Sequence, residues 1–131
     1  MTLVLDASVV IGTLSVADGF EIYRDGDLVA PSLMWSEARS TIHETRWRGE
    51  LDPGIARELS RRLEAVPIAR RSPRRLGDEA WRIADELGWA KTYDAEYLAL
   101  ASLLGCRLVT LDGRLRRGAA RLGFVVSPAE F

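Results

Sequence analysis

The sequence predicts an α/β fold with a mostly parallel sheet covered by helices on both faces. Short, uninterrupted apolar runs alternate along the 131 residues with segments whose apolar residues recur at helical spacing. Because strands buried on both sides read as continuous apolar runs, this alternation is typical of a parallel sheet between two helical layers. No linker, repeat or low-complexity tract interrupts the pattern, so we expect one domain over residues 1–131.

In the first half of the chain, each strand-like run is followed by a helix with a recognisable start. Asp6 or Ser8 can cap the first helix, and Ser32 can cap the helix after the second strand. Asp52 and Pro53 start a further helix, because proline is favoured in a first turn. In order, the expected elements are a strand at 3–6, helices at 7–15 and 18–24, a strand at 28–30, a helix from Ser32 to Gly49, and a helix from 52 to about 65.

Glycines mark the helix ends in the second half of the chain. Gly88, Gly105 and Gly123 each follow a segment with helical periodicity, as expected of residues that close a helix. In order, the expected elements are a strand at 66–69, a helix from Ser72 to Leu87, a helix capped by Thr92 and closed by Gly105, a strand at 107–111, a helix at 115–122, and a strand at 124–126. The residues expected to face the core from the Thr92 helix are Tyr93, Tyr97, Leu100, Ala101 and Leu104.

Composition argues against a secreted or membrane protein. Cys106 is the one cysteine, so no intrachain disulfide can form and a reducing compartment fits best. The N-terminus has no basic region before its first apolar run, and Asp6 interrupts that run, unlike a secretory signal. The longest uncharged stretch, residues 7–17, is too short to cross a bilayer. We expect a soluble cytoplasmic protein without a membrane partner, and Cys106 as a buried small hydrophobic residue rather than a nucleophile.

Positive charge is concentrated in one segment, although the net charge is only −1. Residues 46–75 contain nine arginines and four acids, whereas Lys91 is the only lysine of the chain. The planar guanidinium binds two phosphate oxygens at once, so these arginines could contact RNA. The alternative is a solvated helix face in an arginine-rich composition.

Four acidic residues, Asp6, Glu37, Asp94 and Asp112, form the candidate catalytic and metal-binding site. Ligands of open α/β sheets bind beyond the carboxyl ends of the strands, where Asp6 and Asp112 end two strand-like runs. Asp94 lies in the first turn of its helix and is expected at the same edge, and the long side chain of Glu37 can reach it. Carboxylates brought together repel unless protons or cations neutralise them. The pattern therefore predicts a hard divalent cation and phosphate chemistry.

Each acid taken alone has another explanation. Asp6 could be a helix cap, Asp94 a first-turn acid that compensates the helix dipole, Asp112 a turn residue, and Glu37 a surface residue. Their expected convergence on one edge of one sheet favours a site.

Two hydroxyls and a fifth acid accompany the four acids. Ser8 and Thr110 each lie two residues from an aspartate, where a hydroxyl can orient a carboxylate or a metal-bound water. Capping is the competing explanation for Ser8. Glu96 is a possible fifth ligand, but two residues turn it about 200° around the helix from Asp94, so we expect it to face solvent.

The segments that carry these acids resemble those of PIN-domain ribonucleases, and more narrowly those of VapC-type toxins of bacterial toxin–antitoxin pairs. No single segment is specific to these proteins, but all four segments in this order, in a chain of this length, are specific. The resemblance covers essentially the whole chain. The matching segments are residues 3–8, 30–37, 92–101 and 107–112.

The resemblance implies a three-layer α/β/α sandwich around about five parallel strands, with Thr110 as a polar helper to the four acids. It implies Mg²⁺ or Mn²⁺ and endonucleolytic cleavage of RNA that leaves a 5′-phosphate. It also implies a homodimer and a cognate VapB-like antitoxin that clasps the early helices and blocks the acidic pocket. Trp35 and Trp47 border the helix of Glu37, and we expect them to face such a partner.

Water is the expected nucleophile. A metal-free route through the ribose 2′-hydroxyl would usually need two acid–base histidines, and His43 is the only one. We expect Asp6, Asp94 and Asp112 to bind the metal directly, and Glu37 to bind it directly or through water. Two other functions stay open: a non-toxin PIN nuclease of RNA processing, and a catalytically silent module that binds RNA or protein. The intact acids argue against the silent module.

Overall fold

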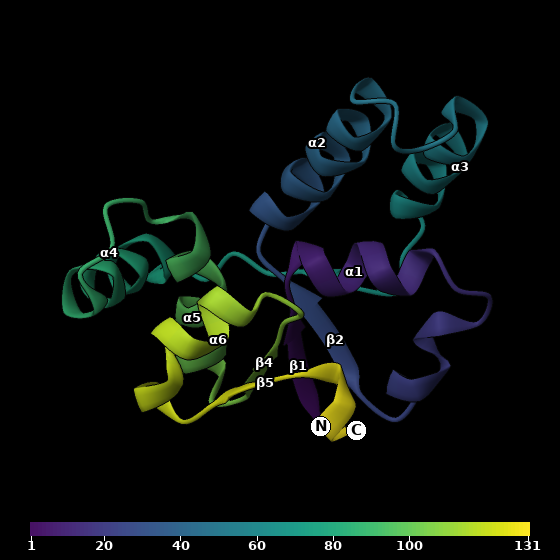
Figure 1. The fold of residues 1–131 in the computed structure, drawn as a ribbon. Helices are drawn as coiled ribbons and strands as arrows, with labels where there is room; N and C mark the ends of the chain where they lie inside the picture. The colour runs from purple at the N-terminus through teal and green to yellow at the C-terminus, as the bar shows by residue number, and fades with distance from the viewer.

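The computed structural model, which describes residues 1–131, places five parallel strands in one sheet with helices on both sides (Figure 1). The strand order is β3-β2-β1-β4-β5, and every neighbouring pair is parallel. This confirms the predicted α/β/α sandwich. The strands are β1 (Thr2–Leu5), β2 (Asp27–Ala30), β3 (Ala69–Arg70), β4 (Arg107–Val109) and β5 (Val125–Val126).

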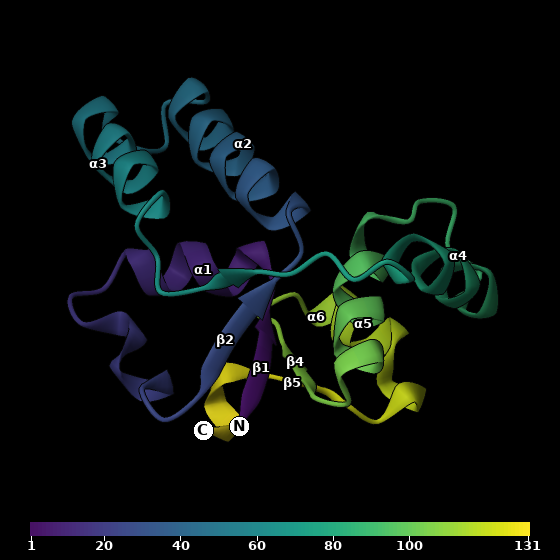
Figure 2. The same ribbon diagram turned by 180° about the vertical axis from the view of Figure 1, so that it is seen from behind.

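The helices divide into two groups on either side of the strands. Figures 1 and 2 show α1, α2 and α3 on one side of the molecule and α4, α5 and α6 on the other, with α2 and α3 projecting as a hairpin beyond α1. The α-helices are α1 (Ala7–Leu14), α2 (Leu33–Trp47), α3 (Pro53–Leu63), α4 (Leu76–Leu87), α5 (Tyr93–Leu104) and α6 (Gly113–Gly118). Short 3₁₀ segments are η1 (Gly19–Tyr23), η2 (Ala120–Leu122) and η3 (Pro128–Glu130).

Helix α5 is the most deeply buried helix, because it packs against both the sheet and α4. Leu98 and Ala99 are fully buried in addition to the predicted stripe, so the apolar surface of α5 extends beyond one face. The prediction that Tyr93 faces the core is wrong, because Tyr93 is 56% exposed at the start of the helix. A helix covered on two sides does not show its orientation through periodicity alone.

Several element boundaries differ from the prediction. Ser32 and Thr92 have helical backbone angles and make no capping hydrogen bond, and the Ser32 hydroxyl lies instead 3.2 Å from that of Ser72. Helix α4 begins at Leu76, because the residues after Pro73 form a turn closed by a hydrogen bond from Leu76 N to Pro73 O. The glycine predictions are confirmed, since Gly88, Gly105 and Gly123 all close helical segments with positive φ.

The strands after residue 66 also start or end elsewhere than predicted. The predicted strand at 66–69 is displaced to Ala69–Arg70 and forms one edge of the sheet. β4 ends at Val109, so Thr110 and Leu111 leave the strand before Asp112 begins α6. Cys106 is half-buried, and burial raises the pKa of its thiol, which agrees with a packing role.

No helix of the protein combines the length and apolar character that crossing a bilayer requires.

Candidate active site

The four predicted acids lie around the carboxyl edge of the central strands. Asp6 follows β1 directly, and Asp112 lies three residues beyond the end of β4. Glu37 is in the second turn of α2 and Asp94 is the second residue of α5. Glu37, Asp94 and Asp112 line one cavity of about 670 Å³, and Asp6 is buried, with 5% of its surface exposed.

The acids also act on one another's pKa values, as expected of carboxylates in one region. The pKa of Asp6 is raised by burial and further by Asp112. The pKa of Glu37 is raised by burial, and then by Asp94, Asp6 and Glu96. The pKa of Asp94 is raised by burial and by Asp112, and the guanidinium of Arg114 opposes this shift. Each of the four acids therefore repels at least one other across the cavity.

The carboxylate of Asp6 is held on both oxygens. Its Oδ1 accepts hydrogen bonds from the Ser8 hydroxyl at 2.6 Å and from the backbone N–H of Val9 at 3.1 Å. Its Oδ2 accepts from the hydroxyl of Thr110, which is fully buried. Asp6 thus is the N-cap of α1, as its alternative explanation required, and is also part of the acidic group. Of about four acceptor positions on a carboxylate, one is left, on Oδ2.

Ser8 and Thr110 each connect Asp6 to the loop after β4. The Ser8 oxygen accepts the backbone N–H of Leu111 at 3.0 Å, and the Thr110 oxygen accepts that of Asp112 at 3.0 Å. Because each hydroxyl accepts from this loop while it donates to the carboxylate, the direction of both hydrogen bonds is fixed. The predicted ability of these hydroxyls to orient a carboxylate matches these contacts.

Glu37 has a partner that the sequence did not indicate. The hydroxyl of Tyr97, which is 1% exposed, donates a hydrogen bond to Glu37 Oε1. Burial and this carboxylate together raise the pKa of Tyr97 far above its ordinary value, so the phenol stays protonated and remains a donor. Tyr97 was predicted only as a core residue. Its spacing of three residues from Asp94 on one helix face was the available signal.

Asp94 and Asp112 keep carboxylate oxygens free of the protein. Asp112 Oδ1 caps α6 by accepting from Arg114 N at 2.9 Å and Leu115 N at 3.3 Å, whereas its Oδ2 accepts no bond from the chain. No side-chain hydrogen bond or ion pair involves the carboxylate of Asp94. These oxygens, and Oε2 of Glu37, are the acceptors that the cavity offers to a ligand.

The orientation predicted for Glu96 is wrong. Glu96 is half-buried, burial raises its pKa, and its charge contributes to the raised pKa of Glu37. The rotation of about 200° turns it away from Asp94, and its charge acts on Glu37 of α2. Glu96 therefore adds negative charge beside Glu37 rather than in open solvent.

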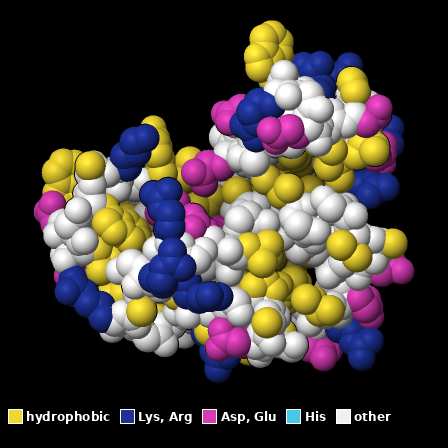
Figure 3. Space-filling view, viewed as in Figure 1, with side chains coloured by type: hydrophobic (Ala, Val, Ile, Leu, Met, Phe, Trp, Pro, Cys, Tyr) yellow, Lys and Arg dark blue, Asp and Glu magenta, His cyan; other side chains and the backbone are white.

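Two cations stand at the same cavity. Lys91 and Arg114 line it together with Glu37, Asp94 and Asp112, and neither forms an ion pair with a carboxylate. Figure 3 shows Lys and Arg side chains gathered over α6, beside acidic side chains. Nothing in the sequence singles out Lys91 and Arg114, because they reach one cavity only through the way α5 and α6 begin next to one another.

The donor set fits a hard cation that keeps part of its hydration. All the free acceptors are carboxylate oxygens, which suit Mg²⁺ or Mn²⁺. No three His, Cys, Asp or Glu side chains are arranged to hold one ion by direct contact, so the acids stand farther apart than in a closed metal cage. Mg²⁺ usually binds one or two carboxylates and retains several waters, and this spacing leaves room for them.

The chain is similar in sequence to a known family and to ribonucleases within it. A family model described as PIN domain matches residues 3–121. VapC ribonuclease Mb0985 of Mycobacterium bovis is 31% identical over 129 residues, which cover 96% of this chain and 98% of that protein. Ribonuclease VapC9 of Mycobacterium tuberculosis has the same identity and coverage.

Three solved structures share the fold at low sequence identity. PAE2754 from Pyrobaculum aerophilum aligns with a TM-score of 0.77 and 23% identity, over 99% of this chain and 85% of that one. A toxin–antitoxin complex from Klebsiella pneumoniae aligns with a TM-score of 0.65 and 15% identity, over 96% of this chain and 97% of that one. VapBC-1 from nontypeable Haemophilus influenzae aligns with a TM-score of 0.61 and 14% identity, over 97% of this chain and 96% of that one. Likeness at these identities concerns the fold alone.

The burial and the mutual repulsion of the acids predict that removing one charge stabilises the metal-free protein. Asp94→Asn should raise the free energy of unfolding at pH 7 in a chelator, because the raised pKa of Asp94 means that its ionised form disfavours the folded state. The gain should shrink as the pH falls through the raised pKa of folded Asp94 and be lost at about pH 3, where Asp94 is largely protonated in both the folded and the unfolded state. Urea denaturation across this pH range measures both effects.

Asp85→Asn on the exposed face of α4 is the matched control, and it should change stability little at any pH. A loss of stability on Asp94→Asn at pH 7 would contradict the repulsion.

Proposed function

Because the chain belongs to the PIN domain family, we propose that it is a metal-dependent endoribonuclease that acts as the toxin of a toxin–antitoxin pair. The observation that carries the proposal is one cavity lined by Glu37, Asp94 and Asp112, with two unpaired cations beside them and Asp6 held nearby. Oxygen ligands for a hard cation next to cations for an anion suit a phosphodiester substrate. The relatives named VapC ribonuclease support RNA as that substrate.

The proposed cofactor is Mg²⁺, with Mn²⁺ as a substitute. The free oxygens of Asp94 and Asp112, the remaining position on Oδ2 of Asp6 and Oε2 of Glu37 would hold it, some of them through its retained waters. When bound, the ion supplies a more acidic water and neutralises charge on the phosphate and on the leaving oxygen.

The chain's own residues would fix the geometry of this reaction. Ser8 and Thr110 keep both oxygens of Asp6 in place, so the carboxylate cannot rotate away. Tyr97 holds Oε1 of Glu37, which leaves Oε2 to accept a proton or a hydrogen bond from the attacking water. Arg114 and Lys91 would hold the non-bridging phosphate oxygens and offset the repulsion between the acids and RNA.

Histidine acid–base catalysis has no counterpart near the acids. His43, the only histidine, is exposed and lines a separate cleft between α2 and α3. His43 thus lies on the surface of this cleft and not among the acids. Water remains the nucleophile that the acidic site supports, and a 5′-phosphate is the proposed product end.

The toxin role and its partners rest on the relatives and on the surface. Solved structures with this fold include a toxin–antitoxin complex, and we propose a VapB-like antitoxin and a homodimer for this chain as well. Trp47, at the end of α2, is 79% exposed and Ile55, on α3, is 54% exposed, which makes the hairpin a suitable contact surface. The expectation for Trp35 is wrong, because Trp35 is 6% exposed in the core and the guanidinium of Arg70 lies 4.1 Å from its ring centre.

Asp94→Asn should abolish RNA cleavage in Mg²⁺ and leave the fold intact. The acid offers the most carboxylate oxygens that the protein leaves free, and its loss should reduce cleavage to below about 1% of wild type. End mapping of the cleaved RNA and circular dichroism of the variant measure the two parts. Cleavage in EDTA at the wild-type rate would refute the metal mechanism.

Arg114→Ala should weaken substrate binding more than turnover. Loss of one phosphate contact should raise KM about tenfold, change kcat less, and lower the slope of log affinity against log salt by about one. The backbone N–H of Arg114 donates to the capping carboxylate of Asp112, and the substitution retains this bond. Arg116→Ala, on the same helix but outside the cavity, is the control; an equal effect there would show only a general loss of charge.

Expression of the wild-type chain should arrest bacterial growth, and Asp94→Asn should not. Co-expression of a short upstream neighbour gene should restore growth if that gene encodes the antitoxin. Cleavage of RNA in vitro without any growth arrest would favour the non-toxin nuclease of RNA processing instead.

A further inference from the structure

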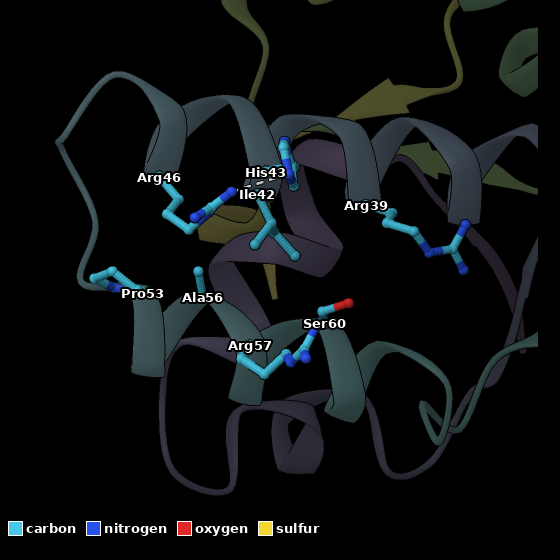
Figure 4. Close-up of a pocket in the computed structure, with 8 residues that line it drawn as sticks. All are labelled: Arg39, Ile42, His43, Arg46, Pro53, Ala56, Arg57 and Ser60. Atoms are coloured by element: carbon cyan, nitrogen blue, oxygen red, sulfur yellow. Dashed lines mark hydrogen bonds between the residues drawn. The ribbon is translucent and has the colours of Figure 1, made fainter.

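A second cleft, separate from the acidic cavity, lies between α2 and α3. It has a volume of about 450 Å³. Figure 4 shows Arg39, His43 and Arg46 along α2, and Arg57 on α3 facing them across the opening. Ile42 and Ala56 provide its apolar floor, and no acidic side chain lines it.

Most of the positive charge in this cleft has no carboxylate partner. Arg39 is paired with Glu64, but neither Arg46 nor Arg57 forms an ion pair. Arg46 instead donates a hydrogen bond to Nε2 of His43 at 3.1 Å; a guanidinium can only donate, so the imidazole nitrogen accepts. This contact draws a cation toward the cleft without neutralising it.

Neighbouring arginines of the same segment behave differently. Arg48 pairs with Glu44 and Glu50, and Arg61 and Arg62 both pair with Glu58. These three arginines of the hairpin, outside the cleft, are thus neutralised close to their own positions in the chain. Two unpaired guanidiniums facing one hollow from different helices repel each other, and an anion between them would remove that cost.

We propose that this cleft binds a backbone phosphate of folded RNA, at a site apart from the one where the chain is cut. Two guanidiniums can each offer paired N–H donors to a phosphate, and the Ser60 hydroxyl adds a donor on the α3 side. An acidic protein segment is the less suitable occupant, because docked peptides bury apolar side chains in apolar grooves and this cleft has only a small apolar floor. The inference rests on the proposed function for its substrate class.

The position of the cleft decides which RNA can use it. Glu37 of the acidic cavity and Arg46 of the cleft are nine residues apart on α2, which corresponds to about 13.5 Å along the helix and about half a turn around it. The two sites therefore lie on opposite faces of one helix. A short single strand fills one of them, whereas a folded RNA that straddles α2 contacts both and gains affinity from the second contact.

Binding without turnover tests the proposal. In an Asp94→Asn background, Arg46→Gln with Arg57→Gln empties the cleft of its unpaired charge. Arg48→Gln with Arg61→Gln removes the same charge from the same hairpin, outside the cleft. The probes are a fluorescein-labelled RNA hairpin and a labelled single strand of the hairpin's loop sequence, followed by anisotropy over a salt series, with circular dichroism as the check of folding.

The cleft variant should bind the hairpin about tenfold more weakly, with a salt slope smaller by about two, and bind the single strand as before. The control variant should bind both probes within about twofold of the parent. Equal losses in the cleft and control variants, no loss at all, or an equal loss for hairpin and single strand would overturn the proposal. The proposal would also be overturned if polyglutamate bound the parent but not the cleft variant while both bound the hairpin equally. That result would assign the cleft to an acidic protein segment.

These results are independent of the proposed activity. If the wild-type protein failed to cleave RNA with Mg²⁺, the nuclease proposal would fail, while the hairpin measurement would still decide whether the cleft binds phosphate.

Discussion

The buried carboxylate of Asp6 is the constraint on which the acidic site depends. Its oxygens start α1 and, through the hydroxyls of Ser8 and Thr110, hold the loop that carries Asp112. A charge with so little exposure is tolerated because three donors surround it. The same bonds align β1 and β4 at their carboxyl ends, so the cavity and the centre of the sheet are fixed together.

Much of the fold could be predicted from local patterns. The apolar runs and the glycines after α4, α5 and η2 reflect burial and backbone angles that each segment shows by itself. The error at Ser32 has a tertiary origin, whereas α4 starts later than predicted because of the local turn from Pro73 to Leu76. Whether a hydroxyl caps a helix or bonds to a distant residue, as Ser32 does with Ser72, depends on tertiary neighbours that no local pattern contains.

The site could be predicted in its acids but not in its supporting residues. Asp6, Glu37, Asp94 and Asp112 follow from strand ends and helix starts, and the structure brings them to one region. Tyr97 is 60 residues from Glu37, and Arg114 and Lys91 meet only because α5 and α6 begin side by side. The nine arginines of residues 46–75 could not be told apart from sequence in the same way. An arginine that pairs with an acid, one that stacks on Trp35 and one that lines a cleft have the same appearance in a sequence.

The bond between Thr110 and Asp6 joins residues 104 positions apart, and this separation affects the time at which the site can form during synthesis. β1 is made first, but its carboxylate gains Thr110, Leu111 and Asp112 as neighbours only after β4 has left the ribosome and joined the sheet. Any activity that needs all four acids is therefore absent from the growing chain until Asp112 has been made and β4 has joined the sheet, and this delay follows from the order of the strands alone.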